Sequence, residues 1–317
     1  MTDPVFSGVH HGKERHASDF DAVLQRAKDV GCKELIITGS DLENSKSAIE
    51  LCKQHPGFLY STIGVHPCST QDFEKHPGGP SALIAALREL IESSPKAFVA
   101  IGEIGLDYDR LTLSPKETQL EHFRSQLKMA ASLPDTPPLF LHSRAAHEDF
   151  LRELKIHHDD LPRRGVVHSF TGTLEEMKEL VEEGWDIGVN GCSLRAAESI
   201  EVVRQIPLER LQIETDGPWC EMRTTHASAT YLKGDHKPEG EPVNDAVAGA
   251  ILAQENEFKW VKKEKWAEGK LVKGRNEPCM IGRVAVAIAR IKGITTQEVA
   301  EAAYHNTVKM FRFREEV

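Results

Sequence analysis

Acidic and histidine side chains follow several short apolar runs of this sequence. Glu103 comes directly after AFVAIG, where burying a carboxylate is costly unless it is paired or holds a metal. Five more polar residues follow apolar runs in the same way: His66 after STIGV, His142 after LFL, His168 after VV, Asn190 after IGV and Asp216 after LQIET. Histidine, glutamate and aspartate are ligands of hard or borderline divalent ions. The pattern therefore predicts a divalent metal centre that includes Glu103.

The apolar runs alternate with segments in which apolar residues recur every three or four positions, as in helices. The predicted strands are Glu34–Gly39, Leu59–Val65, Phe98–Glu103, Leu139–His142, Val166–His168, Ile187–Asn190 and Leu211–Asp216. The predicted helices are Leu42–Gln54, Ser81–Ser93, Pro115–Ser132, Ala146–His157, Leu174–Glu183, Ile281–Ile291 and Thr296–Phe311. Strict alternation of strands and helices predicts a parallel sheet. In a parallel barrel the carboxyl ends of the strands face one mouth, where active sites form.

The count of seven strands is one short of a TIM-like (β/α)₈ barrel, which is the α/β fold we predict. A doubly wound open sheet is the alternative. We interpret residues 1–317 as a single barrel domain. No clear strand is predicted in the segment at about 233–274, which we interpret as an elaborated loop.

The composition, with 40% hydrophobic and 28% charged residues, is typical of a globular enzyme. No apolar run is long enough to span a bilayer and the first residues lack the apolar core of a signal peptide, so we expect no membrane contact and a cytoplasmic or nuclear location. The six cysteines are scattered without a CxxC pair, which disfavours metal–thiolate and disulfide frameworks. A net charge of −10 disfavours nucleic-acid binding over the whole surface but permits a local basic patch.

Such a patch is predicted at residues 259–275, KWVKKEKWAEGKLVKGR, called here the Lys/Trp segment. Its basic side chains include Lys262, Lys263 and Arg275, and Trp260 and Trp266 stand among them. Basic residues along phosphates and aromatic rings stacked on bases grip single strands without reading their sequence. The segment therefore predicts contact with single-stranded nucleic acid, and a solvated charged loop is the alternative.

The motifs GVHP, GEIGLDYDR, FLHSR, VVHSF, NGCSL, ETDGPW and KGRNEP, in this order, resemble those of the TatD family of metal-dependent deoxyribonucleases. The resemblance runs from about Thr2 to Phe311, nearly the whole chain. It implies a (β/α)₈ barrel of the metallo-dependent hydrolase superfamily and magnesium-dependent nuclease activity. Carried over motif by motif, the family's metal ligands fall on Glu103, His142, His168 and Asp216.

The sequence departs from the family pattern at its beginning. The family usually opens with a strand that ends in a His-x-His or His-x-Asp pair, and no such strand precedes MTDPVF. The eighth strand and the opening motif are therefore one and the same missing element. We expect either that this sequence starts after this strand or that the barrel lacks it. We interpret His10 and His11 as loop residues that do not replace the motif.

Hydrolysis of a phosphodiester needs a nucleophile at neutral pH and countercharge for the transition state, and one or two divalent ions can supply both. We expect Glu103 to bridge ions and Asp216 to act as ligand and general base. His142 and His168 would bind as neutral imidazoles, each with an acceptor for its other N–H. The ligand set suits Mg²⁺ or Mn²⁺ and also accepts Zn²⁺, and the resemblance favours Mg²⁺.

Further substrate contacts are expected from His66, Arg144 and Trp219, each of which also has a purely structural interpretation. Three functions remain open. The first is a nuclease on DNA, acting from 3′ to 5′ on single strands or frayed ends, as the resemblance implies. The second is an amide or ester hydrolase, such as a D-aminoacyl-tRNA deacylase, since fold alone does not determine function. The third is a non-catalytic interaction protein. No obligate protein partner is inferred.

Overall fold

The computed structural model describes residues 1–233 and 244–313, and residues 234–243 of the predicted loop at about 233–274 lie outside this description. The chain packs as two compact units. Unit 1 comprises Met1–Lys33, Ser169–Met177 and Gly188–Asn306, and unit 2 comprises Glu34–His168, Lys178–Ile187 and Thr307–Val317. The single barrel domain over residues 1–317 stays a prediction.

Seven strands form a sheet whose order follows the chain, from β3 to β9. They are β3 (Leu35–Ile37), β4 (Leu59–Ile63), β5 (Phe98–Asp107), β6 (Leu139–Arg144), β7 (Gly165–Val167), β8 (Asp186–Val189) and β9 (Leu211–Ile213). Neighbouring strands from β3 to β8 pair in parallel. A doubly wound sheet would reverse its strand order at a switch point. The order observed has no such reversal, so the α/β barrel class is confirmed.

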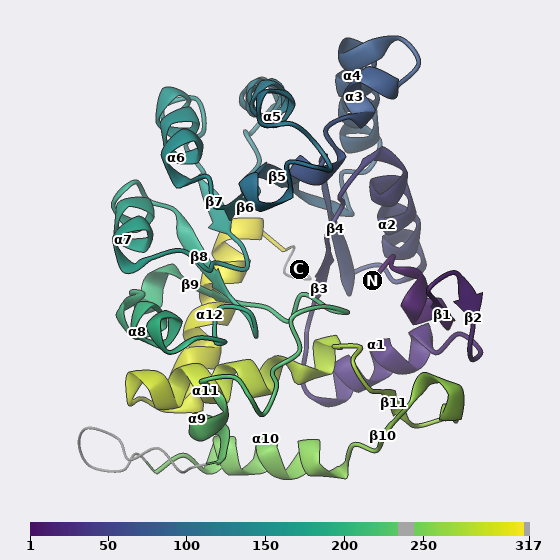
Figure 1. Cartoon of the computed structure of the whole chain (residues 1–317), viewed down its shortest axis with the longest axis vertical. Coiled ribbons are helices and arrows are strands. Elements are labelled where there is room, and N and C mark those ends of the chain that lie inside the picture. Colours follow the sequence, from purple (N-terminus) through teal and green to yellow (C-terminus); the bar gives the residue numbers. More distant parts are fainter. Residues whose placement is uncertain (234–243, 314–317) are drawn as a thin grey trace. The chain divides into compact units, whose positions relative to one another are not determined.

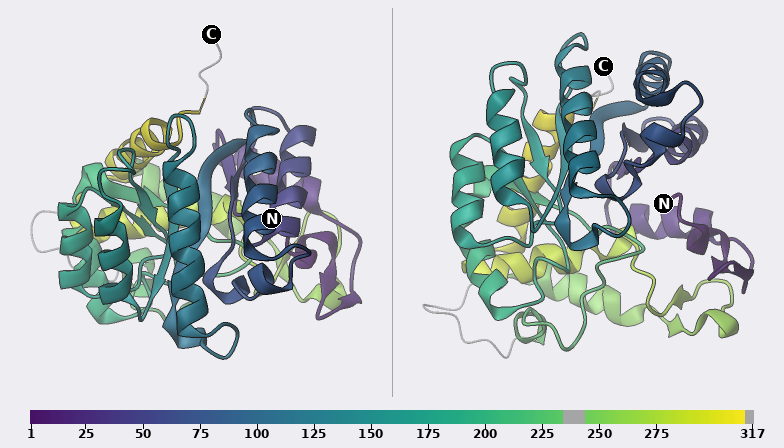
Figure 2. Two further views of the ribbon diagram at one scale, coloured as in Figure 1. Left: turned by 90° about the horizontal axis from the view of Figure 1, so that it is seen from above. Right: turned by 45° about the horizontal axis from the view of Figure 1, so that its top comes forward.

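Helices pack against the strands of unit 2 and keep Glu103 and its neighbours in a buried setting. They are α2 (Leu42–Gln54), α3 (Asp72–Lys75), α4 (Gly79–Glu92), α5 (Lys116–Ala131) and α6 (His147–Ile156), with short 3₁₀ turns at Pro67–Ser69 and Tyr108–Arg110. Helix α2 packs on β4 and α5 packs along β5 (Figures 1 and 2). On α4 the buried residues Leu83, Leu87 and Ile91 recur every fourth position, which is the stripe that helical periodicity predicts.

Five helices lie wholly within the described part of unit 1. Its helices are α1 (Phe20–Asp29), α8 (Ala197–Gln205), α9 (Ala229–Lys233), α10 (Ala246–Glu257) and α11 (Ile281–Lys292), with 3₁₀ turns at Pro4–Ser7, Leu208–Arg210, Lys263–Lys265 and Pro278–Met280. The apolar helix α11 packs against α8, α9 and α10. Helices α7 (Leu174–Glu182) and α12 (Thr296–Phe311) each contain residues of both units. Among the described residues, we find no helix that has the length and apolar character needed to cross a membrane.

Two predictions for unit 1 were wrong. The segment predicted without a strand contains β10 (Trp260–Val261) and β11 (Leu271–Val272), which pair in parallel. His10 is not a loop residue, because β1 (Val9–His10) pairs with β2 (Lys13–Glu14) around a tight turn. Both elements are two residues long, so neither has enough alternating residues to give a strand pattern.

Strand β5 is longer than predicted, and Glu103 lies within it rather than at its end. The pairing with β6 shifts register between Gly102 and Ile104, which places Glu103 at an irregularity of the strand. Two glycines permit the close approach of β6: a Cβ on Gly102 would lie 2.4 Å from the Phe140 carbonyl oxygen, and one on Gly105 would lie 1.9 Å from that of His142. The glycines that resemble a strand break in the sequence are therefore sites of close backbone packing.

Candidate metal centre

The carboxylate of Glu103 is fixed by the strand irregularity of unit 2. Its backbone N–H donates to the Gly39 carbonyl oxygen at 2.7 Å, a contact outside the regular ladder of β5 and β6. The residue is only 9% exposed. A buried carboxylate of this kind needs compensating partners.

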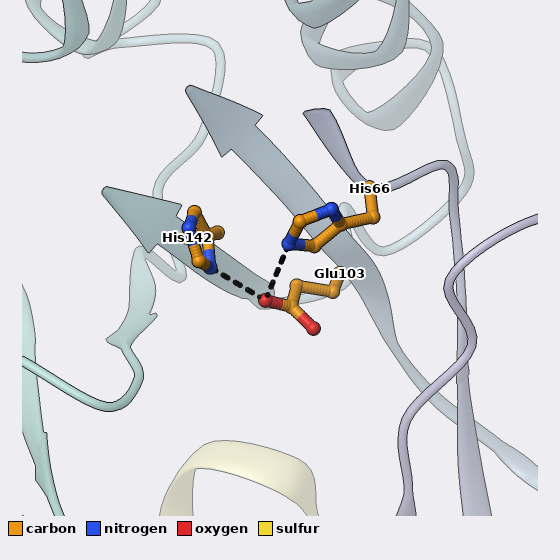
Figure 3. Close-up of side chains that lie close together, drawn as sticks. All are labelled: His66, Glu103 and His142. Carbon is orange, nitrogen blue, oxygen red and sulfur yellow. Dashed lines mark hydrogen bonds and ion pairs between the residues drawn. The ribbon is translucent and has the colours of Figure 1, made fainter. Parts of the chain in front are cut away.

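Three histidine rings supply those partners at one oxygen atom. Glu103 Oε1 lies 2.8 Å from Nδ1 of His142, 2.7 Å from Nε2 of His168 and 3.3 Å from Nε2 of His66. Figure 3 shows the His66 and His142 rings pointing at the same oxygen. His142 lies in β6, His168 directly follows β7 and His66 lies three residues after the end of β4, so strands of one parallel sheet position all three rings, as the sequence pattern predicted.

The donor set fits a divalent ion. Ligand atoms of His66, Glu103 and His142 all lie within 4.8 Å of one another, and His168 joins the same carboxylate oxygen. Imidazole nitrogens and a carboxylate oxygen within this reach are the donors that Mg²⁺, Mn²⁺ and Zn²⁺ share. The described residues of unit 2 therefore form a cluster that could hold a metal ion, and its identity is left open by the geometry.

His66 fits the role of a hydrogen-bond donor better than that of a ligand. Its Nδ1 accepts the backbone N–H of Cys68 at 3.0 Å. A neutral imidazole whose Nδ1 accepts must carry its proton on Nε2, and it is this Nε2 that faces Glu103. A protonated Nε2 has no lone pair for a metal, so His66 presents an N–H at the edge of the cluster.

Asp107 is a member of the cluster that the sequence analysis missed. Its carboxylate is 1% exposed, and Oδ2 lies 3.3 Å from Nε2 of His142, the ring nitrogen that does not face Glu103. This Nε2 is buried, and the Asp107 carboxylate lies near it without the geometry of a full hydrogen bond. Metal-binding histidines commonly give their second N–H to a carboxylate, which orients the ring. The signal was available in GEIGLDYD, because Glu103 and Asp107 are an even number of residues apart on one strand.

Electrostatics couple these groups. Burial by itself would raise the pKa of Glu103, but the charges of His168 and His66 and the histidine hydrogen bonds hold it well below its usual range. Burial by itself would lower the pKa of His142, but the acceptor carboxylates of Asp107 and Glu103 raise it above its usual value. The pKa of His66 is also raised, against its own burial, by Glu103. Without a metal the cluster therefore favours a protonated His142 beside the ionised carboxylate of Glu103.

Asp216 lies in unit 1, in a turn held by its neighbours. Asp216 has a positive φ of 53°, and its backbone carbonyl oxygen accepts the N–H of Trp219 at 2.8 Å. Asn276 of the KGRNEP motif donates its side-chain N–H to Thr215 O at 2.7 Å and its backbone N–H to Pro218 O at 2.9 Å. The motifs ETDGPW and KGRNEP are thus parts of one local structure. The shared role of Asp216 with Glu103, His142 and His168 as metal ligands stays a prediction.

The other predicted site residues have different surroundings. Trp219 is 65% exposed, which leaves its ring available for stacking. Arg144 lies 3.7 Å from Asp109, with 38% of its side chain exposed. Asn190 is fully buried, and its Oδ1 accepts the N–H of Cys192 at 2.9 Å, so it shapes a turn of unit 1.

The Lys/Trp segment divides into exposed lysines and packed residues. Arg275 is 2% exposed and forms ion pairs with Asp19 at 2.6 Å and Glu277 at 2.7 Å. The prediction that Arg275 contacts substrate does not agree with this burial, because its guanidinium group is paired with two carboxylates of unit 1. Trp266 stacks on His16 with ring centroids 4.9 Å apart, and Trp260 packs on an apolar cluster of Leu271, Cys279 and Met280. Lys262 is exposed and Lys263 is half-buried.

Proteins of one known family are similar to this chain over nearly its whole length. The family model described as "TatD related DNase" matches residues 7–312. A deoxyribonuclease Tat-D of Schizosaccharomyces pombe is 42% identical over 98% of this chain and 92% of its own length. A 3′-5′ ssDNA/RNA exonuclease TatD of Erwinia tasmaniensis is 33% identical over 96% of this chain and 98% of its own.

Solved structures agree with this relationship. The crystal structure of an uncharacterized amidohydrolase from Saccharomyces cerevisiae has a TM-score of 0.83 and 36% identity, and it covers 98% of this chain and 97% of its own. That of a hydrolase TatD family protein from Entamoeba histolytica has the same TM-score of 0.83 and 36% identity, over 99% of this chain and 96% of its own. The chain therefore belongs to the TatD-related DNase family, as the motifs indicated, and is a hydrolase of the nuclease class.

Proposed function

We propose that this protein is a metal-dependent exonuclease that hydrolyses DNA from the 3′ end of single strands or frayed duplexes. The observation that carries the proposal is the convergence of His142 Nδ1 and His168 Nε2 on Glu103 Oε1 at 2.8 and 2.7 Å, with His66 beside them. The direction and the single-stranded substrate are supported by the name of the Erwinia relative. A DNA substrate would place the protein in the cytoplasm or the nucleus.

Glu103, His142 and His168 would hold the metal, and Asp216 is proposed as a further ligand from its place in ETDGPW. When bound, a divalent ion lowers the pKa of water and offsets negative charge on the phosphate. We favour Mg²⁺, with Mn²⁺ as the closest substitute, because two carboxylates accompany the two imidazoles. Loading the site requires His142 and His168 to be neutral, so it releases the proton that His142 holds in the metal-free protein.

The chain's own groups have distinct roles in this reaction. Asp107 accepts the Nε2–H of His142 and keeps Nδ1 turned toward Glu103. His66 donates its Nε2–H to a non-bridging phosphate oxygen, a contact that fixes the scissile phosphate at the cluster edge. Asp216 accepts the proton of the attacking water.

Substrate beyond the scissile phosphate is proposed to contact exposed groups of each unit. Arg144 can exchange its long contact with Asp109 for a phosphate, because 3.7 Å is a weak ion pair at a partly exposed site. Trp219 offers an open ring for a base. Lys262 and Lys263 remain candidates for backbone phosphates, whereas Trp266 already has one ring face on His16.

The experiment uses a DNA strand labelled at its 5′ end and a second strand labelled at its 3′ end. The protein is stripped with EDTA and assayed with added Mg²⁺, Mn²⁺ or Zn²⁺. The proposal predicts a ladder of shortened 5′-labelled products, immediate release of the 3′ label, and no cleavage with EDTA. Release of the 5′ label first would contradict the direction. Metal-independent cleavage would contradict the role of the cluster.

A further inference from the structure

Two cysteines of unit 1 lie in contact beside Asp216. The Sγ atoms of Cys192 and Cys220 are 2.7 Å apart, and the Cys220 thiol donates a hydrogen bond to Asp216 Oδ2 at 3.2 Å. Neither cysteine is in a disulfide bond in this structure, and both are partly exposed, so a small oxidant can reach them. A disulfide bond would bring the two sulfur atoms to about 2.05 Å. That distance is reached by side-chain motion of less than an ångström.

The backbone on both sides of the pair holds the sulfurs together. Gly191, next to Cys192, approaches the Cys220 backbone so closely that a Cβ would lie 1.9 Å from the Cys220 carbonyl oxygen. Asn190 fixes the turn that carries Cys192 through its 2.9 Å bond to the Cys192 N–H. Asn276 fixes the turn that precedes Cys220. The backbone contacts of two packed turns therefore bring the two cysteines close together.

The pair is chemically linked to the proposed metal ligand. In the reduced protein the Cys220 S–H gives Asp216 a hydrogen-bond donor on Oδ2. A disulfide has no S–H, so oxidation removes this donor and leaves the carboxylate against a sulfur lone pair. A thiol is a weak donor, but a hydrogen bond to a charged acceptor is stronger than one between neutral groups, so the loss of the S–H removes a contact that orients the Asp216 carboxylate.

We propose that Cys192 and Cys220 form a reversible disulfide that lowers the activity of the enzyme by releasing Asp216. The loss of activity rests on the proposed function, whereas formation of the bond does not. The pair is in this sense a modification site that adds oxidant control to a nuclease.

Hydrogen peroxide is a sufficient oxidant, and the reaction balances in two steps. The Cys192 sulfur attacks one peroxide oxygen, which breaks the O–O bond, gives a sulfenic acid at Cys192 and releases one water. The Cys220 sulfur then attacks the sulfenic sulfur, which forms the S–S bond and releases a second water. Two thiols and one peroxide thus give one disulfide and two waters. A dithiol such as dithiothreitol reverses the bond by thiol–disulfide exchange.

The test treats the dilute, metal-loaded protein with hydrogen peroxide, blocks remaining thiols with iodoacetamide, and maps peptides without reduction. We expect one cross-linked peptide pair that joins Cys192 to Cys220. We also expect loss of activity by about tenfold or more, restored by dithiothreitol. Absence of the cross-link would overturn the proposal. A quantitative cross-link without a change in activity would overturn the link to Asp216.

Three variants separate the outcomes. Cys192→Ser keeps the Cys220 thiol and its bond to Asp216, so it should stay active and resist peroxide. Cys220→Ala lacks the donor, so its reduced form should already have the low activity of the oxidised protein. Cys32→Ser is the matched control, since Cys32 is another partly buried thiol of unit 1, and it should remain sensitive to peroxide. If the reduced protein cleaves no DNA with any metal, the proposed function fails, and peptide mapping still decides the disulfide.

Discussion

Replacing Asp107 by Asn should weaken metal binding in a way that depends on pH. The substitution keeps the shape and an acceptor oxygen but removes the charge that lies 3.3 Å from His142 Nε2 at a 1% exposed carboxylate. Loss of a carboxylate that orients a metal-binding histidine typically costs about 10- to 100-fold in affinity. At 1.36 kcal/mol per factor of ten, this corresponds to about 1.4–2.7 kcal/mol.

The pH dependence follows from the raised pKa of His142, for which Asp107 is the foremost favourable partner. Protonated His142 competes with the metal, so affinity in the native protein rises with pH until the raised pKa is passed. Asp107→Asn lowers that pKa, so it weakens the binding of the competing proton to His142 as well as the binding of the metal. The loss of affinity should therefore be small at acidic pH and reach its full size only above the native pKa of His142.

The same substitution should change the stability of the metal-free protein mainly at acidic pH, where its effect on metal affinity is small. The pKa of His142 in the folded protein is raised above its usual value of 6.5. The stability that protonated His142 contributes is therefore fully present below its pKa in the unfolded chain and is lost as pH rises through its pKa in the folded protein. Asp107→Asn should thus destabilise the metal-free protein most at acidic pH, where His142 is charged.

Titration calorimetry with Mn²⁺ at several pH values measures the affinities, and thermal unfolding with EDTA measures the stability. Asp109→Asn is the control, because Asp109 lies two residues away with a side chain that is 62% exposed. Equal Mn²⁺ affinity of Asp107→Asn and the native protein at every pH would refute the reasoning.

Further predictions concern the proposed metal ligand Glu103, the hydrogen-bond donor His66, the buried Arg275 and the lysines of the Lys/Trp segment. Glu103→Gln should lower hydrolysis by about two to three orders of magnitude with the fold intact by circular dichroism, because lost metal catalysis is large; near-native turnover would exclude its role. His66→Phe, which removes the Nε2–H donor, should reduce turnover of DNA while Mn²⁺ affinity by calorimetry stays within about twofold, as expected of a donor; a parallel loss of affinity would make His66 a ligand. Arg275→Met should lower the free energy of unfolding by about 3–5 kcal/mol, because it leaves two buried carboxylates, Asp19 and Glu277, to share Arg26, and the exposed Lys262→Met is its control. The double variant Lys262→Ala and Lys263→Ala should reduce the slope of log affinity for single-stranded DNA against log salt by about 0.7 for each lost contact; an unchanged slope would make the segment a solvated loop.

Regular periodicity made most helices and strands of the fold predictable. Helix α2 has the predicted bounds, and at α7 Thr173 and Glu176 form a capping box, a pattern that can be read from sequence, with reciprocal bonds of 2.7 and 3.2 Å. Helix α1 was missed because its apolar residues are spread over one short amphipathic segment, FDAVLQRAKD, without a preceding strand. The strands β10 and β11 were missed because they are too short to alternate.

The candidate site could be predicted as a set of residue types but not as a set of contacts. Placement after apolar runs brought Glu103, His142 and His168 together correctly, because parallel strands share a direction. The role of Asp107 depends on the continuation of β5 past Gly105, which the sequence pattern disguises as a loop. The burial of Arg275 depends on Asp19, which is 256 residues away in sequence, so no local pattern could reveal the pair.

The central claim is that Glu103, with His142 and His168, holds a divalent ion. Anomalous scattering from crystals soaked in Mn²⁺ tests it most directly, at a wavelength that identifies manganese. The account predicts an ion within about 2.0–2.4 Å of Glu103 Oε1 and of one nitrogen on each of these two histidines, with His66 outside the coordination shell. Fully occupied manganese elsewhere, with the three histidines still bonded directly to the Glu103 carboxylate, would contradict it.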